Sequence, residues 1–146
     1  MWGRARRDKA VVQRFVTALN ARDLSALEAA LAPDFTYIDS WREGVTGRDI
    51  VMPALRALLD SDPDFGIEID TMDFREPFVL MAGRVNSARF GMGRRAVWQV
   101  LVEGGLVKQY QSWAEGGPPP MSRTVAPGAA RAMPDLAQPR PDIAID

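Results

Sequence analysis

The sequence predicts an α+β fold, with three helices followed by mostly antiparallel strands. Apolar residues recur at helical spacing through most of the first 60 residues, whereas apolar and polar residues alternate over much of residues 67–113. Strands that come late in a chain and follow one another through short turns are typical of α+β proteins. Parallel α/β proteins alternate strands and helices instead, and this sequence does not.

The composition is that of a single globular domain. Of the 146 residues, 47% are hydrophobic and 25% are charged. The formal net charge of −1 provides no basic surface, so we expect no nucleic-acid partner. No apolar run approaches the roughly 18 residues of a membrane span, and the charged N-terminus lacks the apolar core of a signal peptide. We therefore expect a cytoplasmic protein with no membrane partner.

Two absent residue types restrict the chemistry of any active site. The chain contains no cysteine and no histidine. It therefore has no disulfide, no thiol nucleophile, and no imidazole that could act as a base or a metal ligand. The carboxylates show no EF-hand spacing, so we expect neither a metal nor a cofactor. Proton transfer would have to use Asp, Glu, Tyr or Lys.

Two closely linked helices are predicted near the N-terminus. The first covers residues 8–20, behind a frayed terminus, because apolar residues recur there at helical spacing. These residues are Val11, Val12, Phe15, Ala18 and Leu19. Asp23 can cap a second helix, and Pro33 is predicted to end it.

A third helix is predicted to end at Leu59. Thr46, with Asp49 three residues later, is typical of a helix start. Leu55 belongs to an apolar side that continues through the helix. Pro53 lacks the backbone N–H that a helix interior needs, which predicts a late start or a bend.

One early strand and four late strands are predicted. The early strand covers residues 35–41 and is followed by a loop at 42–45. The late strands cover residues 67–75, 78–89, 95–103 and 106–113. The alternation changes parity near residues 70–73, which predicts a bulge there. Gly104 and Gly105 form the tight turn of the last hairpin.

A change in composition predicts a domain boundary after residue 115. Seven of the eleven prolines lie beyond this point, among small and polar residues that cannot build a core. Extended or polyproline-like structure fits such a segment. The predicted organisation is a domain at residues 1–115 and an extended, proline-rich tail at residues 116–146.

Asp39 lies at the end of the early strand, among apolar and aromatic residues. A carboxylate in such surroundings loses hydration, and its pKa is easily displaced, as in many active sites. The alternative is that Asp39 caps the turn that Ser40 and Gly44 begin.

Several segments resemble the NTF2-like superfamily, and within it the SnoaL-like and ketosteroid-isomerase-like branch. They are residues 12–24, 34–39, 46–50 and 98–107, and the similarity covers roughly residues 8–115. A weaker similarity links the chain to limonene-epoxide-hydrolase-like members. The resemblance implies a cone, in which a strongly curved sheet packs against the three N-terminal helices around an apolar pocket. It also implies a homodimer, because family members are commonly dimers.

The resemblance implies three catalytic candidates. Asp39 falls where ketosteroid isomerases keep the carboxylate that moves a proton beside a carbonyl. Tyr37 and Asp39 match the water-holding positions of the epoxide hydrolases, and Arg84 matches their arginine. We therefore expect Asp39 to act as a general base, with Tyr37 and Arg84 orienting or stabilising an oxyanion. Alternatively, Asp39 and Arg84 form a buried ion pair that fixes the shape of the cone.

Other catalytic positions of the family carry different residue types here. The oxyanion donors of the isomerases correspond to Phe15 and Trp98, and the epoxide-hydrolase carboxylates correspond to Asn86 and Ser112. The His and Asp of SnoaL-like cyclases correspond to Tyr110 and Ser112. We expect the ligand-binding residues to be Phe15, Trp41, Leu55, Asn86, Trp98, Tyr110 and Ser112.

Two classes of function remain open from the sequence. One is an isomerase-like or cyclase-like enzyme that moves a proton on a small apolar molecule bearing a carbonyl group. The other is a non-catalytic ligand-binding or dimerisation module, which the altered catalytic positions and the absence of histidine favour. A third interpretation is a stacking platform for a sugar or nucleobase, formed by Trp41, Trp98 and Trp113.

Overall fold

The computed structural model describes residues 2–116 and 120–133. The helices in these residues are α1 (Trp2–Ala21), α2 (Leu24–Ala30), α3 (Arg48–Ser61) and α4 (Met121–Val125). The strands are β1 (Leu31–Ile38), β2 (Glu43–Thr46), β3 (Gly66–Arg75), β4 (Phe78–Ser87), β5 (Gly91–Glu103), β6 (Leu106–Ala114) and β7 (Arg131–Ala132). This order of elements confirms the predicted α+β class. None of the helices described is long and apolar enough to cross a membrane.

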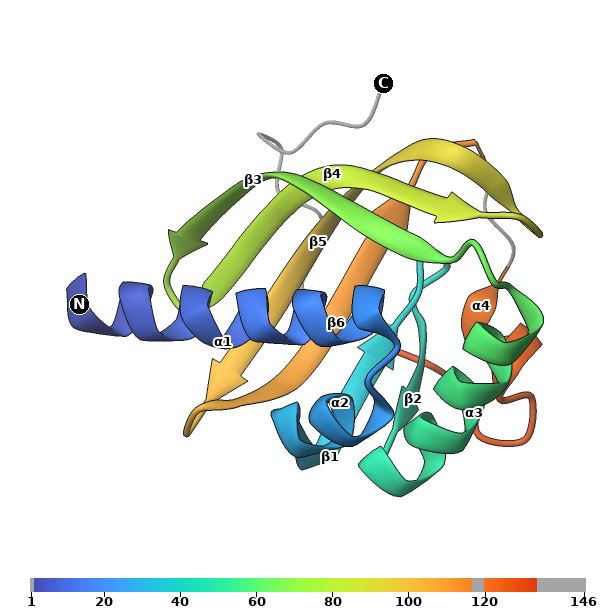
Figure 1. Cartoon of the computed structure of the whole chain (residues 1–146). Coiled ribbons are helices and arrows are strands. Elements are labelled where there is room, and N and C mark those ends of the chain that lie inside the picture. The colour runs from blue at the N-terminus through green and yellow to red at the C-terminus, as the bar shows by residue number, and fades with distance from the viewer. Residues whose placement is uncertain (1, 117–119, 134–146) are drawn as a thin grey trace.

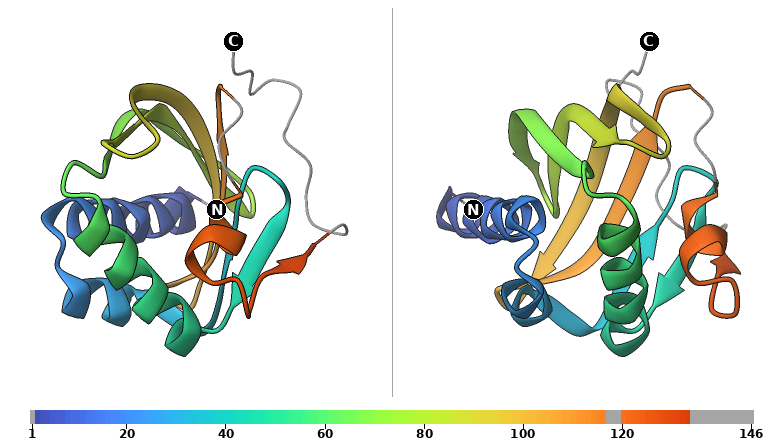
Figure 2. Two further views of the ribbon diagram at one scale, coloured as in Figure 1. Left: turned by 90° about the vertical axis from the view of Figure 1, so that its right-hand side faces the viewer. Right: turned by 45° about the vertical axis from the view of Figure 1, so that its right-hand side comes forward.

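The strands of the described residues form one sheet in the order β3-β4-β5-β6-β1-β2-β7. Neighbouring strands are antiparallel except β1 and β6, which run parallel. Figure 1 shows the long strands β3 to β6 curving behind and above α1, and Figure 2 shows the curvature from two further sides. The strongly curved, mostly antiparallel sheet is therefore confirmed.

The core lies between α1 and the concave face of the sheet. Val12 and Phe15 of α1 are buried there, together with Trp98 of β5. Leu27 of α2 and Leu59 of α3 extend the same cluster toward β1. This arrangement follows from amphipathic helices that bury one apolar side against the apolar face of a sheet.

The N-terminal elements differ from the predictions in two places. Helix α1 begins at Trp2 rather than near residue 8, so the predicted frayed terminus is wrong. An ion pair between Arg4 Nε and Asp8 Oδ2, 3.2 Å apart, joins successive turns of this extension. Strand β1 begins at Leu31, directly after α2, so Pro33 lies exposed within a strand instead of ending a helix.

The middle of the chain follows the predicted pattern with two corrections. Helix α3 begins at Arg48 and continues through an exposed Pro53. The predicted loop at 42–45 is partly wrong, because β2 begins at Glu43 and pairs with β1. The bulge is confirmed by a register shift between Ile69 and Thr71.

The predicted extended tail is wrong for residues 120–133, which we call the C-terminal segment. This segment forms α4 and then β7, which pairs antiparallel with β2. Helix α4 lies beside α3 and β2 (Figure 1). The segment therefore belongs to the domain, and the predicted boundary at 115 is too early. The rest of the predicted tail, residues 117–119 and 134–146, lies outside the described residues.

Candidate functional site

A cavity of about 160 Å³ opens between α1, α3 and the concave face of the sheet. Phe15 and Leu19 line it from α1, and Leu55 lines it from α3. Trp98 of β5 lies at the sheet side. The lining is mostly apolar because these helices and strands turn their buried sides toward one another.

Two tyrosines form the polar part of one wall. Tyr37 of β1 and Tyr110 of β6 are register partners in the parallel pair, and their rings stack with centroids 6.2 Å apart. Phe15 packs against Tyr110 at 5.3 Å between centroids, with the ring planes tilted by 55°. The parallel pairing therefore places two tyrosines at the cavity from strands that lie far apart in sequence.

Burial raises the pKa of both tyrosines above the ordinary value of 10.0. For Tyr37, desolvation is the main cause; a hydrogen bond with Ser112 lowers the pKa, and the nearby charge of Asp39 raises it. For Tyr110, desolvation is again the main cause, followed by Tyr37. Both hydroxyls consequently remain neutral at ordinary pH and can donate hydrogen bonds.

Ser40, in the turn after β1, is hydrogen-bonded to the end of β6. Its hydroxyl donates to the carbonyl of Ser112 at 3.3 Å and accepts from the backbone N–H of Ala114 at 3.1 Å. Ser40 and Ser112 both line the cavity. The contacts fix the last residues of β6 against the turn that follows β1, and so they fix the position of Ser112.

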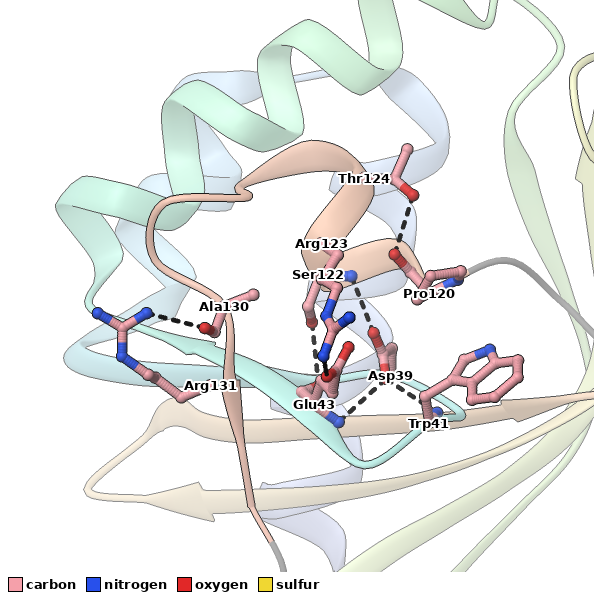
Figure 3. A network of polar contacts seen from close by, with 9 residues as sticks. All are labelled: Asp39, Trp41, Glu43, Pro120, Ser122, Arg123, Thr124, Ala130 and Arg131. Carbon is pink, nitrogen blue, oxygen red and sulfur yellow. Dashed lines mark hydrogen bonds and ion pairs between the residues drawn. The ribbon is translucent and has the colours of Figure 1, made fainter.

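Asp39 does not line the cavity. Its side chain is 1% exposed and bends back onto the turn after β1, where Oδ1 accepts from the N–H groups of Trp41 at 2.9 Å and Glu43 at 3.1 Å. Oδ2 accepts from the N–H of Ser122 at 2.9 Å (Figure 3). The geometry agrees with the turn-capping alternative and adds a long-range contact to α4.

The C-terminal segment completes the cavity on the side of α3 and β2. Met121 and Val125, one helical turn apart on α4, both line the cavity. The Ser122 hydroxyl donates to the carbonyl of Glu43 at 3.0 Å, and Arg123 Nη2 lies 2.6 Å from Glu43 Oε2 (Figure 3). Sequence reasoning missed these residues, although the apolar pair at i and i+4 is the spacing of one helix face.

Three further predicted site residues lie away from the cavity. Arg84 and Asn86 share the opposite face of β4, and Trp41 is 60% exposed. The half-exposed Arg84 lies 3.8 Å from Asp70 between Nη1 and Oδ2. Asn86 donates from Nδ2 to Glu68 Oε2 at 2.9 Å. These three residues therefore do not belong to one pocket, and the predicted ion pair between Asp39 and Arg84 does not form.

The structure thus divides the predicted site in two. Asp39, Trp41, Arg84 and Asn86 do not line the cavity. The residues that do line it are Phe15, Tyr37, Leu55, Trp98, Tyr110 and Ser112. Within residues 2–116 and 120–133, no group of three acidic side chains is placed to hold a metal ion.

Solved structures share this fold at low sequence identity. A candidate ketosteroid isomerase from Kribbella flavida superposes with a TM-score of 0.65 and 18% identity, over 84% of this chain and 89% of the other. An LEH-like epoxide hydrolase from M. tuberculosis superposes with a TM-score of 0.66 and 16% identity, over 85% of this chain and 92% of the other. A candidate SnoaL-like polyketide cyclase from Shewanella denitrificans superposes with a TM-score of 0.65 and 14% identity, over 73% of this chain and 89% of the other.

These superpositions define the class: the chain has the cone-shaped fold of NTF2-like proteins. No curated protein matches the sequence significantly. The family model described as the SnoaL-like domain matches residues 12–110. The chain therefore belongs to the SnoaL-like domain family. Members of one fold carry out different functions, so the site has to be argued from its own residues.

Proposed function

We propose that the protein binds a small, mostly apolar ring compound in the cavity, without using Asp39 as a general base. The observation that carries this proposal is the composition of the cavity lining. Most of the lining is apolar, and two neutral tyrosines lie on one wall. A cavity of about 150 Å³ accommodates a single aromatic ring. The cavity of about 160 Å³ is therefore large enough for one ring of six atoms.

The tyrosines determine which polar group the ring should carry. Because burial keeps both hydroxyls protonated, Tyr37 and Tyr110 can act as donors. A carbonyl oxygen is the matching acceptor, and an apolar ring bearing it would fill the remaining space. The names of the similar structures include a ketosteroid isomerase and a polyketide cyclase, which fits a ring ketone.

Proton transfer is the less favoured function for geometric reasons. A general base must come within about 2.6–3.2 Å of the proton that it removes, directly or through one water. Asp39 lies outside the cavity lining, and its two oxygens already accept three backbone hydrogen bonds. No other carboxylate lines the cavity in the described part of the chain. These observations favour binding over turnover.

The proposal is tested by calorimetric titration with cyclohexanone and with cyclohexane-sized rings that lack a carbonyl. Leu55→Trp should abolish binding, because the larger side chain fills the cavity. Ile50→Trp is the matched control, since Ile50 lies on the same helix at 48% exposure. Equal binding by the Leu55→Trp variant and the wild type would contradict a ligand in this cavity.

A second measurement separates binding from catalysis. Exchange of the α-protons of cyclohexanone in D2O is followed by NMR with wild type and with Asp39→Asn. We expect no protein-dependent exchange beyond the solvent rate. Exchange that requires Asp39 would contradict the non-catalytic proposal and restore the general-base hypothesis.

The homodimer implied by the family resemblance remains a prediction. We propose it as the state in solution, and light scattering coupled to gel filtration measures it directly. A mass of 16.1 kDa, that of one chain, would contradict it.

A further inference from the structure

We propose that the ligand carries a carboxylate group and that Arg94 binds this group. The inference rests on the proposed function, because it concerns the same cavity. Arg94 is the one charged residue that lines the cavity among the residues described. The other lining side chains with polar atoms are the hydroxyl-bearing Tyr37, Ser40, Ser87, Tyr110 and Ser112 and the indole of Trp98.

The backbone around Arg94 leaves a defined path for its side chain. A Cβ atom at Gly91 would lie 2.9 Å from Arg94 Cδ, and a Cβ atom at Gly116 would lie 3.2 Å from Nη2. Both glycines have positive φ angles, +123° and +81°, which other residues rarely adopt. The Arg94 side chain therefore packs closely against two glycines, at its Cδ and at its Nη2.

The guanidinium group is anchored by neutral acceptors. Nη1 donates to the carbonyl of Phe90 at 2.9 Å, and Nη2 donates to the carbonyl of Glu115. These bonds use two of the five N–H donors of an arginine, and both go to neutral carbonyl oxygens. They also fix the planar group before a ligand arrives, so binding loses less side-chain entropy.

The acidic residue in the hydrogen-bond network beside Phe90 is engaged elsewhere. Asp62 is 1% exposed, does not line the cavity, and accepts from the Ser87 hydroxyl and from the N–H of Ala88 at 2.9 Å. The Ser87 oxygen in turn accepts from the N–H of Phe90 at 2.9 Å. Asp62 is thus held by groups other than Arg94.

An apolar cavity that is lined by one fixed cation and, among the described residues, by no carboxylate favours an apolar molecule with one anionic end. A carboxylate matches the fork of a guanidinium group, which can bind both oxygens at once. A neutral ligand would leave the arginine charge with only carbonyl partners. The chemical class that fits is therefore a small ring carboxylate.

The test compares cyclohexanecarboxylate with cyclohexanecarboxamide, which have nearly the same shape but differ in charge. We expect the carboxylate to bind wild-type protein about tenfold or more tightly than the amide. Arg94→Gln should remove this preference, so that the two compounds bind the variant with similar affinities. Arg84→Gln, which removes a half-exposed arginine from the opposite face of the sheet, is the charge-matched control and should keep the preference.

Three results would overturn the inference. They are equal affinities for the two compounds in wild type, a preference that persists in Arg94→Gln, and a preference that is lost equally in Arg84→Gln. If Arg94→Gln does not fold, the inference is tested on the wild type alone. The ratio of its affinities for the carboxylate and the amide should exceed one and should decrease as the salt concentration is raised. Binding of both compounds without preference contradicts only the role of Arg94. Binding of neither compound, nor of cyclohexanone, contradicts the proposed function as well.

Discussion

The Asp39 carboxylate accepts a hydrogen bond from the backbone N–H of Ser122, 83 residues further along the chain, at 2.9 Å. This contact joins the turn after β1 to the first turn of α4 (Figure 3). It assigns to Asp39 the task of holding the C-terminal segment against the domain. Met121 and Val125 then reach the cavity from that segment.

Asp39→Asn is predicted to weaken the attachment of α4. Trp41, Glu43 and Ser122 all present N–H donors to Asp39, so an amide must turn its own N–H2 group toward at least one of them. An unsatisfied buried donor costs about 1–3 kcal/mol. Hydrogen exchange measured by mass spectrometry should become faster at residues 121–126. Asp60→Asn, at an exposed position of α3, is the control, and equal exchange in both variants would contradict the attachment role.

Arg123→Ala is predicted to have a much smaller effect than Asp39→Asn. Arg123 pairs with Glu43, but its own side chain is 67% exposed, and exposed ion pairs contribute about 0–1 kcal/mol. Thermal unfolding in low and high salt measures the difference. A destabilisation larger than that of Asp39→Asn would show that the ion pair holds the segment.

The two tyrosines are predicted to make the protein less stable at high pH. Their pKa values are raised in the folded state, so at pH above 10.0 the unfolded chain loses phenolic protons that the folded chain retains. The free energy of unfolding therefore falls as the pH rises above that value. Below it, both states are protonated and the tyrosines contribute no pH dependence.

The measurement is simple because the chain contains only two tyrosines. Absorbance of tyrosinate near 295 nm should rise together with loss of tertiary structure rather than before it. Tyr110→Phe should move the alkaline transition to higher pH. An absorbance rise in the still-folded protein near pH 10 would contradict the effect of burial.

Ser87→Ala is predicted to destabilise the fold. It removes the hydroxyl that donates to the buried Asp62 carboxylate and accepts from the N–H of Phe90. A buried group that loses its partner costs about 1–3 kcal/mol, and more when it is charged. Urea unfolding should show this loss, whereas Ser61→Ala, at an exposed position, should change stability by less than about 0.5 kcal/mol.

The sequence predicted the helices and the long strands because their periodicity is local. Phe15 and Leu19 repeat at helical spacing, and both line the cavity. Arg84 and Asn86 are two residues apart on β4, so the alternation of a strand places them on one face. The sequence could not identify that face as the outer one. Alternation separates the two sides of a strand but does not show which side is turned toward the core.

The local sequence offered the turn cap of Asp39, but it could not predict the long-range contact of this residue. Its contact with Ser122 depends on how β1, β2 and α4 meet in space. The prolines near residue 120 indicated extended structure and concealed the apolar pair Met121 and Val125. A helix of five residues carries too few repeats for its periodicity to be visible.

The position of the C-terminal segment also has a consequence for synthesis on the ribosome. Among the residues described, every other one that lines the cavity precedes residue 117, so these residues leave the ribosome before Met121 and Val125. Translation proceeds at about 5–20 residues per second. During synthesis there is therefore an interval in which the nascent domain lacks the part of the cavity wall that Met121 and Val125 supply. Residues 120–133 end that interval when they fold against β2 and α3.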